Sequence, residues 1–446
     1  MELHELTVAQ TAGMIRRREI SPVKLLEALL QRIDKTEPAI KAWKTLDRQG
    51  ALEAAQRAEK EALGDVGPLH GVPVGVKDVI FVAGLPNTND SLIFEKFIPS
   101  YDATCVARLR RAGAIMLGKT RTVQFAFSDP TETRNPWNQT LTPGGSSSGS
   151  GAAVAARMVP AALGTQTGGS VLRPAAYCGA VGLKPTYGRI SRYGVTPNTW
   201  TVDTMGVIVR TVEDAALMLQ VMAGKDDRDP SSVGLRVPDY LHAVRRKKKA
   251  PRLGLIKELL DRAQPAVAAH VREIVSRFER AGAQIQEIKL PLSLPEITAI
   301  RNTIGDVEMA NIHGRLCREK SEGYKPIIKA RVEVGQLIPG VYYIQAQRIR
   351  RRLRPQMERL FSGVDCLVMP TASNLPPDPK TTGDSSFQGL WTLFGFPSIS
   401  LPSGLSNDRL PFATQLVGPH FREDKLLGFA AWCEEVLGPM PSPPGT

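Results

Sequence analysis

Two glycine-serine turns hold the residues whose types and spacing could do chemistry. The first turn, GGSSSGSG, places Ser146 directly after two glycines, and the second, TGGS, places Ser170 after another glycine pair, 24 residues later. Glycine lets a turn adopt backbone angles that are closed to other residues, so each turn can present a hydroxyl at an unusual angle. A serine hydroxyl attacks a carbonyl carbon only when an adjacent base removes its proton. The rest of the chain must therefore supply a base.

The base that the sequence offers is Lys77, at the end of the alternating apolar stretch GVPVGVK. This alternation predicts a strand around residues 71–79 that carries the lysine into a packed interior. Burial removes the solvation of the ammonium group, which lowers its pKa and lets the neutral amine accept a proton. We therefore expect Lys77 to act as the base for a nucleophilic serine.

The second turn also predicts a site for negative charge. A proline is tolerated in a helix only near its first turn, so Pro174 places a helix start close to Ser170. Unpaired main-chain N–H groups and the positive end of the helix dipole converge at such a start. We expect an oxyanion hole formed by the N–H groups of Thr167, Gly168, Gly169 and Ser170.

The segments GVPVGVKD, GGSSSGSG and GTQTGGSVLRPAAYCGAVGLKPTYG together resemble the amidase signature hydrolases, which cleave amide-type bonds with a Ser-Ser-Lys triad. The resemblance implies that Lys77 is the base, Ser146 the bridging serine and Ser170 the nucleophile. It also implies a cis peptide bond between Gly145 and Ser146. The fold implied is α/β, the amidase signature fold, with a mixed central β-sheet sandwiched between helical layers.

The resemblance runs from near residue 5 to near residue 435, with specific motifs only between about residues 70 and 190. Two positions depart from the family's common pattern. Gln166 stands where many members carry an acid, and the arginine after the nucleophile lies three positions on, at Arg173, instead of two. Malonamidase-like members share this placement, and there the arginine binds a substrate carboxylate. Arg173 is expected either to bind such a carboxylate or to pair with a structural acid.

The elements that must position these residues follow from local patterns. The alanine-rich residues 150–158 predict a closely packed helix, and residues 161–165 predict a short apolar strand. Helices dominate from about residue 295 to residue 361. Within them the basic stretch RIRRRLR, residues 348–354, indicates an amphipathic helix with one wet face, which Pro355 would kink or end.

Two further motifs offer other chemistry. Residues 145–149 fit G-x-S-x-G, the nucleophile elbow of an α/β-hydrolase-type esterase, with Ser147 as nucleophile and Asp365 and His420 as partners. That elbow needs an apolar strand before the serine, whereas the polar stretch TETRNPWNQTLTP precedes it. Residues 113–120, GAIMLGKT, satisfy a phosphate-binding pattern, but the four residues that should form an open loop read as a strand. We expect no nucleotide there.

Composition limits the remaining classes. A chain of 446 residues, 42% hydrophobic and without low-complexity tracts, can bury a large core, and its length alone would allow two or three domains. The continuous α/β pattern favours one large domain over residues 1–437, which the resemblance implies is an amidase domain, followed by a flexible proline-rich tail at 438–446. The net charge of +13 supports statements about solubility and weak association only, so we infer no nucleic-acid partner.

The cysteines and histidines give no metal signature. The 5 cysteines are odd in number and lack a C-x-x-C pair, which favours free thiols in a reducing compartment. The 6 histidines lack metal-binding spacing, so we expect no metal and no cofactor. The chain shows neither a signal peptide nor an apolar run that could span a membrane. A cytoplasmic protein without a membrane partner is expected.

The sequence thus predicts an amidohydrolase that cleaves small-molecule amides, or related carbamates (urethanes) or ureas, through an acyl-enzyme, with ester hydrolysis as a side activity. A homodimer is compatible with this prediction. Within the family, the alternative is a glutamyl-tRNA amidotransferase A-type subunit, which feeds ammonia to its complex. A non-catalytic binding protein on the same scaffold is disfavoured because the lysine and both serines are present.

Overall fold

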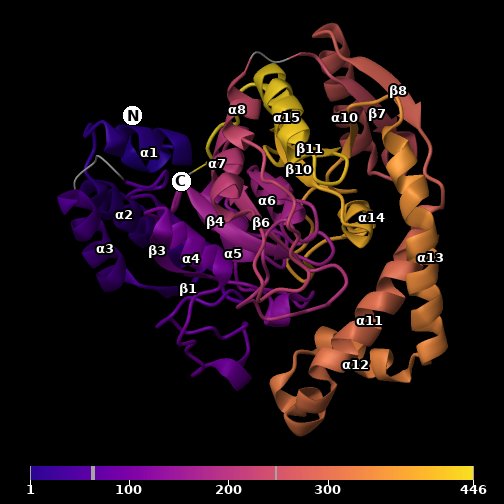
Figure 1. Ribbon diagram of the computed structural model, residues 1–446, viewed down its shortest axis with the longest axis horizontal. Coiled ribbons are helices and arrows are strands. Elements are labelled where there is room, and N and C mark those ends of the chain that lie inside the picture. The colour runs from indigo at the N-terminus through magenta and orange to yellow at the C-terminus, as the bar shows by residue number, and fades with distance from the viewer. Residues whose placement is uncertain (1, 62–65, 247–248, 445–446) are drawn as a thin grey trace.

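The computed structural model describes residues 2–61, 66–246 and 249–444 (Figure 1). A mixed 11-stranded sheet runs through these residues in the order β1-β3-β2-β4-β6-β5-β10-β11-β9-β7-β8. The strands are β1 (Trp43–Leu46), β2 (Pro73–Lys77), β3 (Ile115–Thr120), β4 (Ala161–Gln166), β5 (Val181–Lys184), β6 (Thr204–Val209), β7 (Arg252–Ile256), β8 (Gln284–Ile288), β9 (Cys366–Pro370), β10 (Ser398–Leu405) and β11 (Pro411–Val417).

Helices cover both faces of this sheet. The longer helices are α1 (Val8–Arg16), α2 (Pro22–Ile40), α3 (Arg48–Lys60), α4 (Thr104–Arg111), α5 (Ser148–Ala155), α6 (Leu172–Cys178), α7 (Val212–Met222), α10 (Pro265–Arg280), α11 (Leu294–Glu319), α12 (Pro326–Leu337), α13 (Gly340–Glu358), α14 (Ser386–Phe394) and α15 (Glu423–Leu437). Two short helices, α8 (Tyr240–Arg245) and α9 (Lys257–Asp261), flank β7.

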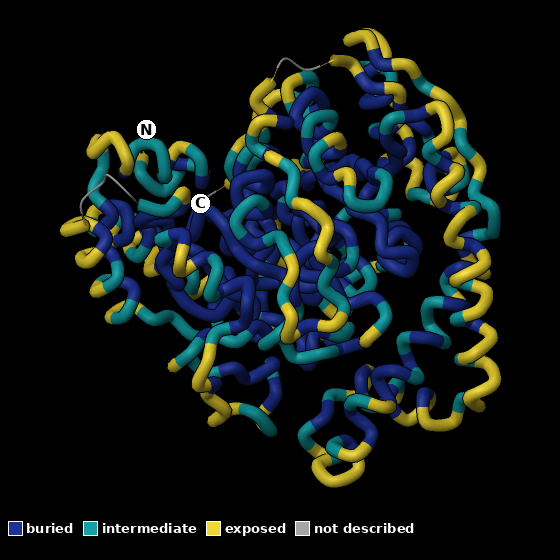
Figure 2. Tube along the Cα trace, viewed as in Figure 1, coloured by how far each residue is buried: buried dark blue, intermediate teal, exposed yellow. Residues whose placement is uncertain are grey.

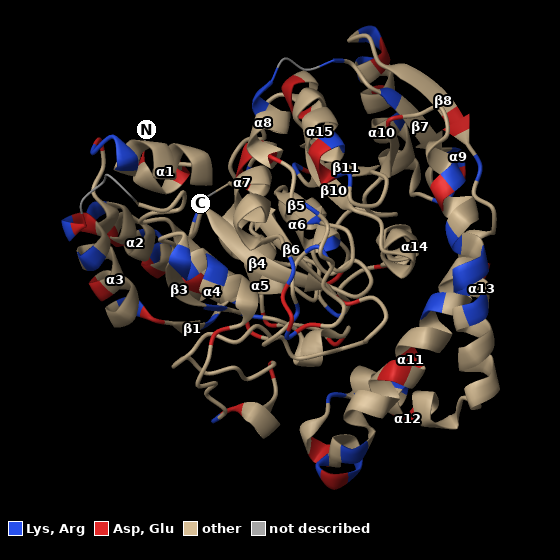
Figure 3. Ribbon diagram, viewed as in Figure 1, with Lys and Arg blue, Asp and Glu red and all other residues tan. Residues whose placement is uncertain are grey.

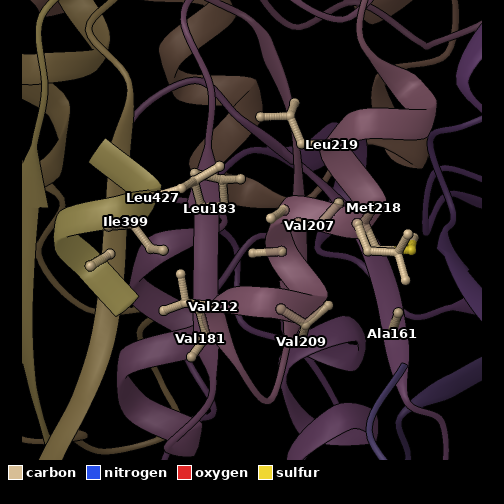
Figure 4. Close-up of a cluster of buried hydrophobic side chains, with 14 of the residues drawn as sticks. Ala161, Val181, Leu183, Val207, Val209, Val212, Met218, Leu219, Ile399 and Leu427 are labelled. Carbon is tan, nitrogen blue, oxygen red and sulfur yellow. The ribbon is translucent and has the colours of Figure 1, made fainter. Parts of the chain in front are cut away.

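Alternation along the strands divides the core into layers. In β6, Val207 and Val209 point into the cluster formed with α4, α7 and α15, whereas Ile208 points into the cluster formed with α2, α3 and α5. Successive strand side chains face opposite sides of a sheet, so one strand serves both layers. Figure 4 shows the first of these clusters, where Val207 and Val209 lie near Met218 of α7. The predicted α/β fold with a mixed sheet between helical layers is confirmed.

The parallel centre of the sheet determines where Lys77 lies. Strand β2 pairs in parallel with β3 on one side and with β4 on the other, and all of its residues are buried. Parallel strands covered on both faces are buried throughout, so even a lysine at the end of β2 has no route to solvent. Figure 2 shows this central region as mostly buried, with exposed segments at the periphery.

Two predicted elements differ from the structure. The alanine-rich helix begins at Ser148 and ends at Ala155 rather than covering residues 150–158. Helix α13 continues through Pro355 and ends only at Glu358, so of the two expected effects an end at Pro355 is wrong, and a kink there stays a prediction. A proline inside a helix removes one backbone hydrogen bond, but α13 is already within one turn of its end there.

The pair α11 and α13 lies side by side at one end of the molecule, with the exposed arginines of α13 in the C-terminal half of that helix (Figure 3). Across the described residues, no helix has the length and apolar character that a bilayer crossing requires. Residues 438–444 contain no helix or strand, and the Ser442 hydroxyl donates to the Glu5 carboxylate at 3.3 Å. Residues 445–446 of the predicted tail lie outside the described residues, and its flexibility stays a prediction, as does the single-domain boundary.

Candidate active site

Lys77 and Ser146 meet in the interior. Strand β2 ends at Lys77, and its Nζ lies 2.8 Å from Ser146 Oγ. The same nitrogen lies 2.8 Å from Thr165 Oγ1 and 3.4 Å from the Thr165 carbonyl oxygen, on the neighbouring strand β4. Lys77 and Ser146 are both fully buried. The peptide bond between Gly145 and Ser146 is cis, as the family resemblance implies.

Burial determines the charge of this amine. No carboxylate forms a salt bridge with Lys77 among the described residues, so an ammonium group there would be buried without a counter-ion. Desolvation accordingly holds the pKa of Lys77 well below its ordinary value, and the more distant Asp203 carboxylate raises that pKa in part. The environment favours the neutral amine, which can accept a proton.

The second serine lies on a turn that contacts the first. The main-chain N–H of Ser147 donates to the carbonyl of Ser170 at 3.2 Å, which joins the two turns. The Ser170 hydroxyl has no hydrogen-bond partner among the described residues and borders a cavity of about 310 Å³. Ser170 is therefore the serine that a bound molecule can reach, whereas Ser146 is fully buried beside Lys77, and no hydrogen bond joins the two serine hydroxyls among the described residues.

The predicted oxyanion residues also border this cavity, since Thr167, Gly168, Gly169 and Ser170 all line it. The described residues accept no hydrogen bond from the main-chain N–H groups of Gly168, Gly169 or Ser170. Helix α6 starts two residues beyond Ser170, and its first N–H groups are already taken by a side chain. The free N–H groups are thus those of the turn itself.

The side chain that caps α6 is Gln166. Its Oε1 accepts from the N–H groups of Val171 and Leu172 at 2.9 and 3.0 Å. Its Nε2 donates to Thr392 Oγ1 at 3.0 Å, and Thr392 Oγ1 donates to the Gly168 carbonyl at 2.8 Å. A carboxylate could form the cap but has no N–H for Thr392. Because a trans peptide holds its N–H opposite its C=O, fixing the Gly168 carbonyl turns the next N–H away from α14.

Arg173 is buried and lines the same cavity. Its Nη2 donates to the Gly145 carbonyl at 2.7 Å and to Thr382 Oγ1 at 3.2 Å, and its Nε has no partner among the described residues. No salt bridge joins Arg173 to an acid in the described part of the chain. Of the two expected roles, pairing with a structural acid is wrong.

The other motifs are not assembled as active sites. Ser147 is fully buried, with its hydroxyl 3.4 Å from the Thr165 carbonyl oxygen. Its predicted partners face elsewhere: Asp365 pairs with Arg252 at 2.9 Å, and a ring nitrogen of His420 lies 2.9 Å from the Phe394 carbonyl oxygen. The α/β-hydrolase triad is therefore absent from the described residues.

The phosphate-binding pattern at residues 113–120 falls on strand β3, as predicted. Its Lys119 is fully buried in a salt bridge with Asp78 at 3.1 Å, so this lysine faces no ligand. Within residues 2–61, 66–246 and 249–444, no group of three or more acidic, histidine or cysteine side chains could hold a metal ion. The cysteines are free and buried.

Sequence reasoning missed several residues of the site. Thr165 belongs to no recognisable motif. The parallel pairing of β2 with β4 is what brings it next to Lys77. For Asp203 the sequence allows two roles, support of the active-site loops and an ordinary turn residue; in the structure its carboxylate accepts from Thr167 Oγ1 at 2.6 Å and from two main-chain N–H groups. Arg301 reaches the cavity from helix α11, and nothing in its local sequence signals that position.

Comparison with known proteins shows which family the chain is similar to over most of its length. Residues 24–427 match the family model described as Amidase. The chain is 38% identical over 467 residues to the A-type subunit of glutamyl-tRNA(Gln) amidotransferase from Methylococcus capsulatus, covering 96% of each chain.

Two solved structures superpose on the chain over almost all of its residues. A chain from a vestigial protein complex that bears on the origins of an s-triazine catabolic enzyme superposes with a TM-score of 0.91 at 28% identity, covering 98% of this chain and 100% of that one. The peptide amidase of Stenotrophomonas maltophilia superposes with a TM-score of 0.84 at 30% identity, covering 98% of each chain.

The crowding of the turn at residues 167–170, called the oxyanion turn for its predicted role, gives a first prediction. A Cβ on Gly169 would lie 2.2 Å from Gln388 Oε1, whereas one on Gly168 would lie 3.2 Å from Ser385 Oγ. Gln388 is buried and bonded to the Thr371 carbonyl, so the turn must move instead. Gly169→Ala should lower kcat by about 100-fold or more, as loss of an oxyanion donor does, and Gly168→Ala by less.

Steady-state kinetics and thermal unfolding of both variants check this order. Gly340→Ala, where a Cβ would meet nothing within 4 Å, serves as the control and should match the unaltered protein. Equal activity of the Gly169→Ala and Gly340→Ala variants would contradict a role for the turn.

The influence of Asp203 on Lys77 gives a second prediction. With Lys77 as the predicted base the neutral amine would be the active form, so kcat/KM should rise with pH through the pKa of Lys77. Because Asp203 raises that pKa, Asp203→Asn should move this pH-dependent rise in kcat/KM to lower pH. It should also reduce kcat, because an amide has one acceptor oxygen and cannot serve both Thr167 and the main-chain N–H groups that the two carboxylate oxygens accept from. Asp214→Asn removes another buried acid that accepts a main-chain N–H and should leave the pH of this rise unchanged. If the rise of kcat/KM in Asp203→Asn occurs at the same pH as in the unaltered protein, or at higher pH, the assignment of this rise to Lys77 is refuted.

Proposed function

The chain belongs to the amidase signature family, and we propose that it hydrolyses the C–N bond of a small amide, or of a related carbamate (urethane) or urea, through an acyl-enzyme. The observation that carries this proposal is the 2.8 Å contact between the buried Lys77 Nζ and Ser146 Oγ. A neutral amine has two N–H groups and one lone pair. Thr165 offers two acceptors for the N–H groups, which leaves the lone pair for the Ser146 proton.

The proposed reaction passes a proton along the two serines. Lys77 accepts the proton of Ser146 as Ser146 accepts that of Ser170, and Ser170 Oγ bonds to the substrate carbonyl carbon. The N–H groups of the turn from Thr167 to Ser170 stabilise the negative charge on the carbonyl oxygen. The proton returns by the same route to the nitrogen, the C–N bond breaks, and the amine leaves. Water then attacks the ester and releases the acid.

Arg173 is the proposed substrate-binding residue. Its guanidinium lines the cavity beside Ser170 and lacks a carboxylate partner among the described residues. A guanidinium remains charged in proteins and matches the geometry of a carboxylate. Its bond to the Gly145 carbonyl would also hold the first turn in place while a substrate is bound.

A second function is favoured by the names of the relatives. The Methylococcus capsulatus relative is the A-type subunit of glutamyl-tRNA(Gln) amidotransferase, and a chain with that role would release ammonia from an amide within a complex. Copurification of the chain with two partner subunits from its native source would support this second function. Turnover of simple amides by the isolated chain would favour the first. A small-molecule substrate and a homodimer remain part of the first proposal.

The third prediction separates chemistry from folding. Ser170→Ala and Lys77→Met should each reduce amide turnover to background, because the first removes the nucleophile and the second the base. Methionine fills the space of a buried lysine without an amine, so Lys77→Met should retain the thermal unfolding midpoint more closely than Lys77→Ala. A panel of amides, carbamates, ureas and esters measures turnover, and mass spectrometry after a serine-directed probe locates the label.

Ser147→Ala is the comparison for the nucleophile, since Ser147 is the neighbouring serine that the alternative motif would use. This variant should retain labelling at Ser170. Near-normal hydrolysis by the Ser170→Ala or Lys77→Met variant would remove the proposed mechanism.

A further inference from the structure

The cavity in front of Ser170 has a cationic wall. Among the described residues that line it, the charged ones are Arg173, Arg301, Arg331 and Asp306. The Asp306 carboxylate lies 2.6 Å from Arg331 and forms an ion pair with it. The only acid in the described wall is therefore already neutralised, and Arg173 and Arg301 remain as cations.

Arg301 is held in place by neutral groups. Its Nη1 donates to the Ser385 carbonyl at 3.1 Å and to Ser385 Oγ at 3.2 Å, and its Nη2 donates to Asn302 Oδ1 at 3.4 Å. Helix α14 leaves space for the guanidinium, because a Cβ on Gly389 would lie 1.7 Å from Nη1. A Cβ on Gly168 would lie 3.5 Å from the same nitrogen. Arg301 thus sits next to the oxyanion turn.

No acid in the described residues compensates these two cations at contact distance. Asp384 lies within electrostatic reach of both, but its carboxylate accepts from the Ser386 N–H at 3.0 Å and forms no salt bridge with either arginine. Burial and the neighbouring Arg173 lower the pKa of Arg301, to about 10, so it stays charged at neutral pH. A cation placed away from water without a counter-ion is costly, and an anion brought by a ligand removes that cost.

We propose that the substrate is a small amide that carries a carboxylate and no ammonium group, and that Arg301 joins Arg173 in binding this carboxylate beside the oxyanion turn. This inference rests on the proposed amide hydrolysis. The cavity, at about 310 Å³, lies at the small end of ligand sites. An ammonium group next to the carboxylate would approach two arginines and find no free acid in the described wall, so like charges would repel it. The charges of the cavity therefore disfavour the binding of glutamine, which differs from glutaramate only by that ammonium group.

Three amides of one carbon skeleton test the inference on the purified full-length chain. Glutaramate carries the carboxylate, glutaramide replaces it with a neutral amide, and glutamine adds an ammonium group. We expect kcat/KM for glutaramate to exceed that of the other two by about tenfold or more, mainly through KM. The four-carbon set of succinamate, succinamide and asparagine should follow the same order. Equal or better use of the neutral diamides, or of glutamine and asparagine, would overturn the inference.

Variants assign the effect to Arg301. Arg301→Gln should abolish the advantage of glutaramate and leave glutaramide within about twofold, and Arg301→Lys should restore part of it because the charge returns without the planar fork. Arg350→Gln is the matched control, since Arg350 donates to the main-chain carbonyl of Leu393 in α14, as Arg301 does to that of Ser385 just before this helix, but does not line the cavity. It should retain the advantage. Equal losses on glutaramate and glutaramide in Arg301→Gln would mean a structural role and refute the assignment.

Direct binding keeps the inference separate from catalysis. Calorimetric titration with glutarate, which is not hydrolysed, should give binding that weakens about tenfold or more in Arg301→Gln and stays unchanged in Arg350→Gln. If no amide is hydrolysed but glutarate binds in this pattern, the proposed function fails and the carboxylate site stands. If amides are hydrolysed but glutarate binding is absent or equal in all three proteins, the carboxylate site fails and the function stands.

Discussion

The desolvation of the Lys77 amine is the constraint on which the rest of the site depends. Strand β2 places this amine between β3 and β4, where hydroxyl and carbonyl oxygens lie close to it and no carboxylate of the described residues forms a salt bridge with it. The neighbouring strand carries a second buried lysine, Lys119, but that one forms a salt bridge with Asp78. Two lysines at the same depth therefore have different chemistry, because a counter-ion stabilises the charged form of one and is missing for the other.

Hydrogen bonds between the two serine turns, and from Arg173 to the first of them, fix the position of one turn relative to the other. The Ser147 N–H bonds to the Ser170 carbonyl, and Arg173 bonds to the Gly145 carbonyl. Behind the second turn, Gln166 and Thr392 tie the Gly168 carbonyl to α14. A glutamine suits this place because it accepts at one end and donates at the other, which a carboxylate cannot do. These contacts explain why a glutamine, and not an acid, stands at position 166 of this chain.

The same helix that supports the oxyanion turn also shapes the charge of the cavity. Helix α14 and the segment before it supply the Ser385 groups that hold Arg301, and Gly389 leaves the space for its guanidinium. Helix α11 brings Arg301 and Asp306 to the wall from a distant part of the chain. Catalytic turns of one type can thus serve different substrates, because the wall opposite them comes from other elements.

The sequence by itself determined the residues whose geometry is local. Glycine pairs before Ser146 and Ser170 identify the turns, and the alternation ending at Lys77 identifies a buried strand, because these signals lie within a few residues of the side chain concerned. The family resemblance that these motifs carry implied the α/β fold, and the continuous apolar run at residues 114–117 indicated a strand where the phosphate motif needs an open loop.

Only the tertiary structure decided which distant groups complete the site. Thr165 meets Lys77 through the pairing of β2 with β4, and Arg301 reaches the cavity through the packing of α11. The sequence likewise does not predict that α13 ends beyond Pro355. A proline shows that one helical hydrogen bond is absent, but not whether the surrounding contacts still support the helix. Contacts of this kind depend on strand register and helix packing, which short stretches of sequence do not encode.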